Sequence, residues 1–490
     1  MLLGGTLLAL SCCNSSSSRL KSKSAIQTKT QGEQLSQEQF VPTIAVPQCE
    51  DFMDLVSEVK AAGGLPVFVP ADTPGDLGQL AANWDGAIMK DGWVSKDNGF
   101  SVLFYKAVCD RNVPRVGSSA FSDEMDRSLK RYPSDVVDCA SLTAKARTYA
   151  HAKKLMDSIF TIDSHGDLPC EYDEGWRLGK RGDNQINLPK MEEGHLDSHV
   201  LISYLGQGAT DPQSEKAAFA KCDGIIDMIY DDVKDNEDKC GIVFTPKEAL
   251  SLKAEGKKPF FIAIENGYGL GGQLSSVEHY ARRGVVYMTL SHTRDNLLCH
   301  SSSNSADTTK GLTPFGIQVV EEMNRLGIMV DCSHTSSGTL RDSLRYSKAP
   351  VICSHSGAMA MYRHNRNLTD SQMRAVAAKG GIVQVYIVDY FMDSDPSKVG
   401  INHFMDHLLH TIEVAGVDHA GIGGDFDGGG GGWGLNGDND MINITARLIE
   451  SGFNDEDIAK VWGGNFLRVL SEVQASAPDY PFKDRMWRHC

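Results

Sequence analysis

Residues able to bind a metal ion stand at the ends of short apolar runs in the middle of the chain. They are Glu265 after 260–264, His292 after 285–290, Asp331 and His334 after 328–330, and His355 after 351–353. A single histidine in such a place is usually an ordinary core or surface residue. Several at successive strand ends are hard to explain by chance, and together they predict a metal site.

The segments between these runs have the length and the apolar spacing of helices. Phe315, Val319, Met323 and Leu326 illustrate the spacing. An order of strand, helix, strand, helix with chemistry at the strand ends is typical of a (β/α)8 TIM-type barrel, whose site lies at the C-terminal mouth. We count eight strands, from 158–163 through 198–204, 260–264, 285–290, 328–330, 351–353 and 382–386 to 420–424.

The first and last of these strands add further candidates. His165 and Asp167 follow the first strand at a spacing that puts both side chains on one face, which amounts to half a metal site. Asp425 follows the eighth strand and precedes a glycine run at 428–432. Its position predicts that it faces the mouth of the barrel rather than serving only as a turn residue.

These imidazole and carboxylate groups favour a borderline divalent ion such as zinc, and they are too many for one tetrahedral site. We therefore expect two Zn²⁺ ions bridged by one carboxylate, with Glu265 as the natural bridge. A hydroxide shared by the two ions could attack a carbonyl carbon. His292 would stabilise the oxyanion, and Asp425 would pass the proton to the leaving group.

Several motifs in this region resemble the renal (membrane) dipeptidase family of zinc peptidases. The motifs are IDSHGDLP at 162–169, NLPKMEEG at 187–194, IEN at 264–266, YMTLSH at 287–292, GLTPFG at 311–316, MNRLGIMVDCSH at 323–334, APVICSHS at 349–356, RNLTD at 366–370 and GIGGDFDG at 421–428. The resemblance spans about 162–473. It implies a metallodipeptidase whose substrates are dipeptides.

The resemblance also implies a role for each matching residue. One zinc ion would bind His165, Asp167 and Glu265, and the second would bind Glu265, His334 and His355. Catalysis would fall to His292 and Asp425. Substrate would be bound by His292, by Arg366 through its free carboxylate, and by Tyr386.

The sequence departs from the family pattern at three positions. Asn266 stands where the family usually has glycine, Gly166 replaces a common asparagine, and Tyr386 stands near a usual asparagine. None of these changes removes a ligand. They bear on substrate preference more than on activity.

Two other functions compete with dipeptide hydrolysis. One is another amidohydrolase-type reaction, such as the opening of a lactone or a β-lactam, with the same metals and a different pocket. The other is a catalytically inactive binding lipoprotein, which predicts the loss of at least one ligand. All five candidate metal ligands are present, which favours an enzyme.

The length and the net charge of the chain limit the number of domains and the classes of partner to be expected. A chain of 490 residues suggests more than one domain, and a formal net charge of −16 argues against nucleic acid as a partner. We expect an export signal, lipid-anchor site and linker at 1–40, a small doubly wound α/β domain at 41–150, the barrel at 151–480 and a tail at 481–490. The sequence leaves the oligomeric state open, a homodimer included.

The small α/β domain also resembles, more weakly, the class I glutamine-amidotransferase fold. That family carries a nucleophilic cysteine in a tight Gly-x-Cys-x-Gly turn, and the matching turn at 116–121 has no cysteine and ends in Phe121. We therefore expect a domain that is not catalytic. Gly117–Ser119 would be its ligand contact, if it has one.

The chain starts with an apolar run that stops at Cys12 and Cys13, before a serine-rich stretch. This pattern resembles a bacterial lipoprotein processing site and predicts a periplasmic or cell-surface protein. The membrane would be reached only through a lipid on Cys12 or Cys13, because no other segment is long and apolar enough to span it.

Mass spectrometry of the native N-terminus tests this expectation. We expect a mature chain that begins at Cys12 or Cys13 and carries a lipid. A mature chain that keeps Met1 and has no lipid would refute export by this route.

Overall fold

The computed structural model describes residues 139–303 and 308–483. The expected N-terminal segment 1–40 lies outside the described residues, and so does the expected small domain 41–150 up to residue 138, with its turn Gly117–Ser119. Most of the expected tail, 484–490, also lies outside them. The described fold is therefore that of the expected barrel and the helix that leads into it.

Eight parallel strands form the path of the central sheet, in the order β1-β2-β4-β5-β6-β7-β9-β10. They are β1 Ile162–Gly166, β2 Ser198–Tyr204, β4 Lys258–Glu265, β5 Val285–Thr289, β6 Met329–Asp331, β7 Val351–Ala358, β9 Ile382–Val385 and β10 Ala420–Ile422. A parallel bridge between Gly166 and Phe426 brings the end of β1 to the segment after β10. This nearly closed barrel confirms the predicted (β/α)8 TIM-type fold.

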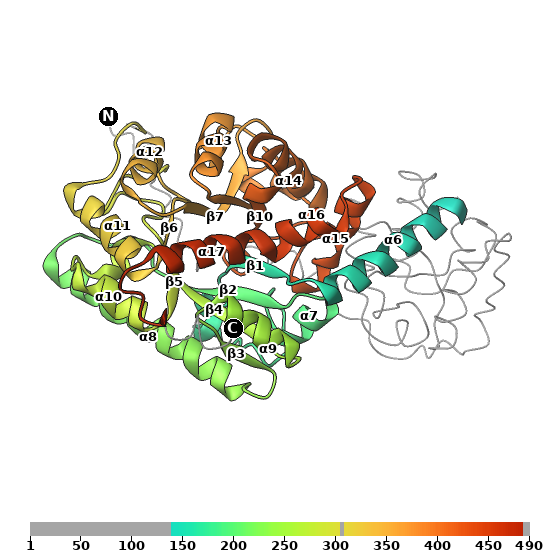
Figure 1. Ribbon diagram of the computed structural model, residues 1–490, viewed down its shortest axis with the longest axis horizontal. Helices are drawn as coiled ribbons and strands as arrows, with labels where there is room; N and C mark the ends of the chain where they lie inside the picture. The colour runs from blue at the N-terminus through green and yellow to red at the C-terminus, as the bar shows by residue number, and fades with distance from the viewer. Residues whose placement is uncertain (1–138, 304–307, 484–490) are drawn as a thin grey trace, which may run out of the picture.

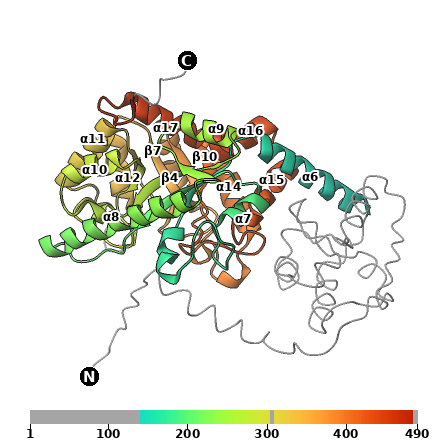
Figure 2. The same ribbon diagram turned by 90° about the horizontal axis from the view of Figure 1, so that it is seen from below.

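Helices surround the strands (Figure 1). They are α6 Cys139–Ser158, α7 Leu188–Glu193, α8 Pro212–Asp235, α9 Pro246–Ala254, α10 Ser275–Arg282, α11 Pro314–Leu326, α12 Ser337–Tyr346, α13 Asp370–Ala378, α14 Ile401–Ala415, α15 Ile442–Glu450, α16 Asp455–Ala459 and α17 Asn465–Ser476. Figure 2 shows α17 on the side of the strands opposite to α7. Among the described residues, no helix combines the length and apolar composition needed to cross a membrane.

Side chains along β4 alternate between two apolar clusters, as the pleat of a strand requires. Ile262 packs in the cluster shared with the surrounding helices. Phe261 and Ala263 pack in a second cluster that includes apolar residues of α17, and the rings of Phe261 and Phe466 meet edge to face with centroids 5.6 Å apart. Glu265 has the same parity as Phe261 and Ala263, so the strand directs its carboxylate to the inner face.

The unit of α11 and β6 shows how local sequence builds one turn of the barrel. Thr313 caps the helix by accepting a hydrogen bond from the backbone N–H of Gly316. Gly327 ends the helix in the left-handed region with φ 77°, where glycine has no steric cost. The predicted helical positions pack against the core, and they are Phe315, Val319, Met323 and Leu326.

Two details of the predicted strands are wrong. The first strand was expected at 158–163, but α6 continues through Ser158, whose hydroxyl donates to the carbonyl of Leu155, and β1 begins only at Ile162. Strands β3 Cys240–Ile242 and β8 Asn367–Leu368 were not predicted, because runs this short show no periodicity. Strand β8 pairs with β7 and so places the residue before it, Arg366, beside the mouth.

Candidate metal centre

The predicted site residues converge at the C-terminal ends of the barrel strands. Glu265 is the last residue of β4, and His165 lies in β1 one residue before its end. The strand predicted to lead to His355 continues past it, so that this residue lies inside β7. The other candidate ligands and catalytic residues lie in loops beyond the strand ends, and they are Asp167, His292, His334 and Asp425.

Two groups of possible ligands share one carboxylate. Glu265 Oε1 lies 3.0 Å from His334 Nε2 and 3.3 Å from His355 Nε2. The same oxygen lies 3.8 Å from His165 Nε2, which is 3.5 Å from Asp167 Oδ2. The ligand atoms of Glu265, His334 and His355, and those of His165, Asp167 and Glu265, each lie within 4.8 Å of one another. This is the arrangement that a pair of ions with a bridging carboxylate requires.

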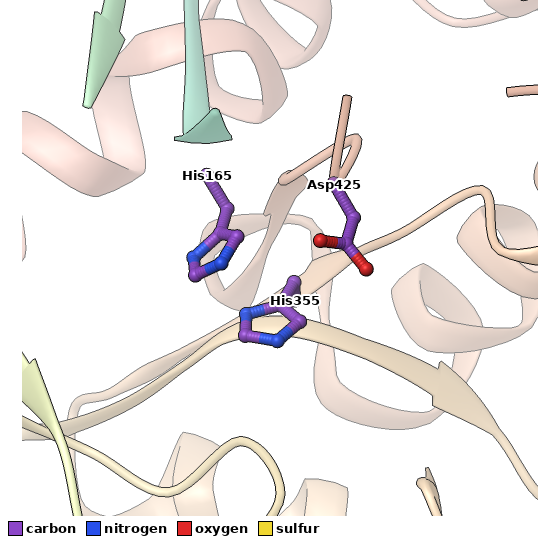
Figure 3. Close-up of side chains that lie close together, drawn as sticks. All are labelled: His165, His355 and Asp425. Carbon is purple, nitrogen blue, oxygen red and sulfur yellow. The ribbon is translucent and has the colours of Figure 1, made fainter. Parts of the chain in front are cut away.

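Asp425 closes a third group with two of the same histidines. Figure 3 shows the carboxylate of Asp425 beside the rings of His165 and His355, and the three ligand atoms lie within 4.8 Å of one another. The backbone N–H of Asp425 donates to the carbonyl oxygen of His165. The end of β1 therefore fixes Asp425 in place, so that its side chain borders both groups.

The backbone is strained at three residues of this centre. His334 has φ 63°, Asp425 has φ 62° and Asn266 has φ 86°, all in a region that side chains other than glycine rarely adopt. Such a residue costs on the order of 1–3 kcal/mol and persists only where its surroundings enforce it. Asn266 combines φ 86° with ψ 106°, outside the left-handed helical region that asparagine tolerates, so glycine would adopt this conformation with less strain.

The hydrogen bonds around His165 leave its Nε2 free to bind a metal. Tyr287 donates its hydroxyl proton to the carbonyl oxygen of Ser164 at 2.8 Å. The same hydroxyl lies 2.8 Å from His165 Nδ1, so it accepts a proton from that nitrogen. Nδ1 thus carries a hydrogen, and Nε2, which faces Asp167 and Glu265, is the nitrogen that would bind a metal ion in place of a proton.

His355 is oriented in the same way by a neighbouring serine. Ser354 Oγ donates to Asp331 Oδ2 at 2.7 Å and therefore accepts from His355 Nδ1 at 2.8 Å. The lone pair of His355 is again on Nε2, which lies 2.8 Å from His334 Nε2 and 3.3 Å from Glu265 Oε1. Asp331 also accepts a hydrogen bond from Thr289, so this carboxylate supports the ligands from behind and does not join the cluster itself.

His292 has a different partner. Its Nδ1 lies 3.3 Å from the hydroxyl of Tyr204, and the two rings meet edge to face with centroids 4.8 Å apart. Its Nε2 lies 3.9 Å from Glu265 Oε1, farther than the Nε2 atoms of His334 and His355. His292 therefore borders the cluster as a possible hydrogen-bond donor to a bound substrate.

The charges at the centre are strongly coupled. Burial alone would raise the pKa of Glu265, but His292 and the other nearby histidines hold the pKa of this carboxyl well below its usual range. Burial lowers the pKa of His334 and of His355, so both rings are neutral. Burial opposes ionisation of His165, yet Asp167, Glu265 and Asp425 together raise its pKa to about 10.

The residues present fit divalent metal ions. His165 Nε2 and Asp167 Oδ1 are buried and have no hydrogen-bond partner among the described residues, although buried polar atoms are nearly always paired. Burial also raises the pKa of Asp425 to about 6. Buried carboxylates this close to one another repel unless a cation lies between them, and a donor set of imidazoles and carboxylates suits zinc.

Arg366 lies next to the cluster and is 4% exposed. Its Nη2 donates to the carbonyl oxygen of His355 at 2.9 Å, whereas its Nε has no partner among the described residues. The guanidinium lies over the rings of Tyr386 at 5.4 Å and Phe391 at 5.7 Å. Tyr386 is fully buried and donates its hydroxyl proton to Asn367. Its ring contacts Arg366, and its predicted contact with substrate stays a prediction.

Sequence reasoning missed the residues that orient His292 and the candidate ligands. Tyr204, Tyr287 and Ser354 all belong to strands, where a tyrosine or serine looks like any other core residue. Tyr287 stands in the YMTLSH motif and Ser354 immediately precedes His355. Their nearness to ligands in the sequence was the one available signal.

A (β/α)8 barrel with imidazole and carboxylate groups converging at its C-terminal mouth defines a barrel protein with a metal-binding centre. Residues 149–482 match the family described as membrane dipeptidase, peptidase family M19. The chain belongs to this family, which confirms the resemblance seen in the sequence motifs.

Individual relatives agree with this membership. The dipeptidase tcpJ of Claviceps purpurea is 33% identical over 250 residues, which are 51% of this chain and 59% of that protein. The crystal structure of the probable dipeptidase PvdM from Pseudomonas aeruginosa has a TM-score of 0.64 and 28% identity, covering 68% of this chain and 99% of that chain. A metallopeptidase from Rhodobacter sphaeroides, solved with a phosphinate mimic of the dipeptide L-Ala-D-Ala, shares the fold with a TM-score of 0.58 and 22% identity, covering 64% of this chain and 99% of that one.

The role of Tyr287 can be tested with Tyr287→Phe. Loss of the hydroxyl removes the acceptor for His165 Nδ1–H, and we expect zinc affinity to fall about 10- to 100-fold, as is usual for the loss of a partner behind a ligand. Competition with a chromophoric chelator measures the affinity. Tyr149→Phe is the matched control, because Tyr149 is also a buried tyrosine but bonds Asn443 in α15. Equal zinc affinity in the Tyr287→Phe variant and the parent would show that this hydroxyl does not orient a ligand.

Proposed function

We propose that this chain hydrolyses the peptide bond of dipeptides and that it uses two zinc ions to do so. The observation that carries the proposal is the sharing of Glu265 by two separate groups of candidate ligands. Membership of the membrane dipeptidase family and likeness to proteins named as dipeptidases support the substrate class.

Each ion would have its own histidines. His165 and Asp167 would hold one ion together with Glu265, and His334 and His355 would hold the other together with the same carboxylate. When bound, the two ions supply a water molecule that loses its proton near neutral pH, and they polarise the scissile carbonyl. Tyr287 and Ser354 keep the ligand histidines in the tautomer that this requires.

The other residues handle charge and protons. Burial lowers the pKa of His292, so the ring is neutral and can donate from Nε2 to the carbonyl oxygen as that oxygen gains negative charge. Asp425 takes a proton from the attacking water on a carboxylate oxygen and gives it to the nitrogen of the leaving amine. Its position beside His165 and His355 supports this role (Figure 3).

Arg366 would read the free carboxylate of the dipeptide. A cavity of about 120 Å³ borders both Arg366 and His334, and hydroxyl groups make up much of its lining. The unpartnered Nε of Arg366 is buried, which leaves a charge-assisted hydrogen bond available to a carboxylate. Because Arg366 also bonds the carbonyl of His355, the carboxylate is held close to the cluster. Only a short peptide places both its scissile bond and its carboxylate correctly.

The substrate class can be tested with Arg366→Ala. Loss of a charge-assisted pair in a buried site costs on the order of 2–4 kcal/mol, which is roughly 30- to 1000-fold in kcat/KM for a dipeptide. The amide of the same dipeptide lacks the charge, so its kcat/KM should fall much less. The measurement is the ratio of kcat/KM for the dipeptide to that for its amide, with zinc content determined on the same samples.

Arg363→Ala is the matched control, since Arg363 lies in the same loop but is exposed. It should leave the ratio unchanged. If Arg366→Ala keeps both its zinc and the parental ratio, Arg366 does not bind the carboxylate.

A further inference from the structure

A buried ion pair lies outside the metal cluster and has no part in the chemistry above. His199 in β2 and Asp438, which begins the 3-10 helix Asp438–Asp440, are joined by Nε2 and Oδ1 at 2.7 Å, and neither side chain is exposed to solvent. Burying two charges costs about as much as their attraction returns, so such a pair is weak evidence for stability. The pair is of interest because of its position beside the end of β1, which carries His165 and Asp167.

The ring of His199 lies against the backbone between two candidate metal ligands. Strands β1 and β2 pair Asp163 with His199, and the next residues of β1 lead to His165, Gly166 and Asp167. A Cβ atom on Gly166 would lie 2.9 Å from His199 Nδ1 and 2.6 Å from Ile186 Cδ1. The Ile186 methyl group can move aside, but the imidazole is held by Asp438. The imidazole of His199 therefore occupies the space that a side chain at position 166 would need.

The pair also fastens the loop that carries Asp425. Asp438 Oδ2 accepts a hydrogen bond from the backbone N–H of Asn187, and Asp427 accepts from the backbone N–H groups of Gln185 and Ile186. The segment 184–187 is thus held by two carboxylates of the segment after β10. Through these contacts, His199 connects β2 and the end of β1 to the loop on which Asp425 lies.

We propose that His199, held by Asp438, is a positioning residue that sets where the end of β1 places His165 and Asp167. Burial opposes a charge on His199, but Asp438 and Asp163 raise its pKa. The 2.7 Å contact with Asp438 Oδ1 holds the ring in one orientation. A rigid ring behind Gly166 keeps the two ligands at the spacing needed for one ion. This inference rests on the proposed metal-binding role of His165 and Asp167, but not on the identity of the substrate.

The test is a double-mutant cycle with the full chain and Zn²⁺ alone as the probe. Gly166→Ala forces a methyl group against the ring, and His199→Ala removes the ring. Each should weaken zinc binding about tenfold or more, as changes behind a ligand usually do. In the double variant the methyl group of the alanine at position 166 occupies the space that the imidazole of His199 has left. We expect its zinc affinity to exceed the additive value by about tenfold, because the two residues fill the same space.

Further variants separate positioning from general stability. His199→Gln can still donate to Asp438 and should keep more zinc affinity than His199→Ala. It also serves if His199→Ala does not fold. Gln474→Ala is the control, since Gln474 is an equally buried polar residue that bonds Phe244 instead. It should lower the melting temperature without changing zinc affinity.

The outcomes decide between the two roles. Variants at 166 and 199 that melt earlier but bind zinc like the parent would show that the pair is merely structural. Additive losses in the double variant would show that the two residues do not share a space. In a third outcome, the parent protein binds zinc and its variants show the expected non-additive losses, while none of them hydrolyses dipeptides. That result would refute the proposed substrate class but would support the positioning role of His199.

Discussion

One carboxylate oxygen organises this structure. Glu265 Oε1 lies between 3.0 and 3.9 Å from the Nε2 atoms of four histidines that come from different strands and loops, namely His165, His292, His334 and His355. Burial disfavours a charge on Glu265, and the imidazoles overcome that cost. These side chains reach one point because a parallel barrel brings the C-terminal ends of all its strands around one mouth.

The fold meets this demand through the alternation of side chains along β4. Phe261 and Ala263 bury the inner face against α17, and two residues later the same face presents Glu265 at the mouth. Apolar packing at one end of the strand thus supports chemistry at the other. The mouth itself is strained, because His334 and Asp425 both have a positive φ. Core packing elsewhere offsets this cost, and the strained backbone directs both side chains inward.

The strand-end residues and the barrel could be predicted from the sequence, because both produce patterns among residues that are close together in the chain. An apolar run followed by histidine or carboxylate needs no tertiary information to be noticed, and the eight runs followed in order. The partners Tyr204, Tyr287 and Ser354 could not be found in the same way. Their roles depend on which strands are neighbours in the barrel. They also depend on the register between those strands, because a shift of one residue would move a hydroxyl out of hydrogen-bond reach.

Other features were beyond prediction for similar physical reasons. The start of β1 depends on how far α6 continues, and a residue such as Ser158 suits either state. The His199–Asp438 pair joins residues that are 239 positions apart in the chain. A histidine inside an apolar strand gives no sign of its partner, and only the fold shows that it lies against Gly166. Long-range pairing is the part of a site that periodicity does not encode.

The central claim is that Glu265 binds two ions at once, and metal stoichiometry tests it most directly. Elemental analysis after equilibrium dialysis against Zn²⁺ should give two ions per chain for the parent protein. Glu265→Gln is close in size and keeps one acceptor oxygen but no charge, so both sites should weaken together. Retention of one or two tightly bound ions by the Glu265→Gln variant would contradict the account.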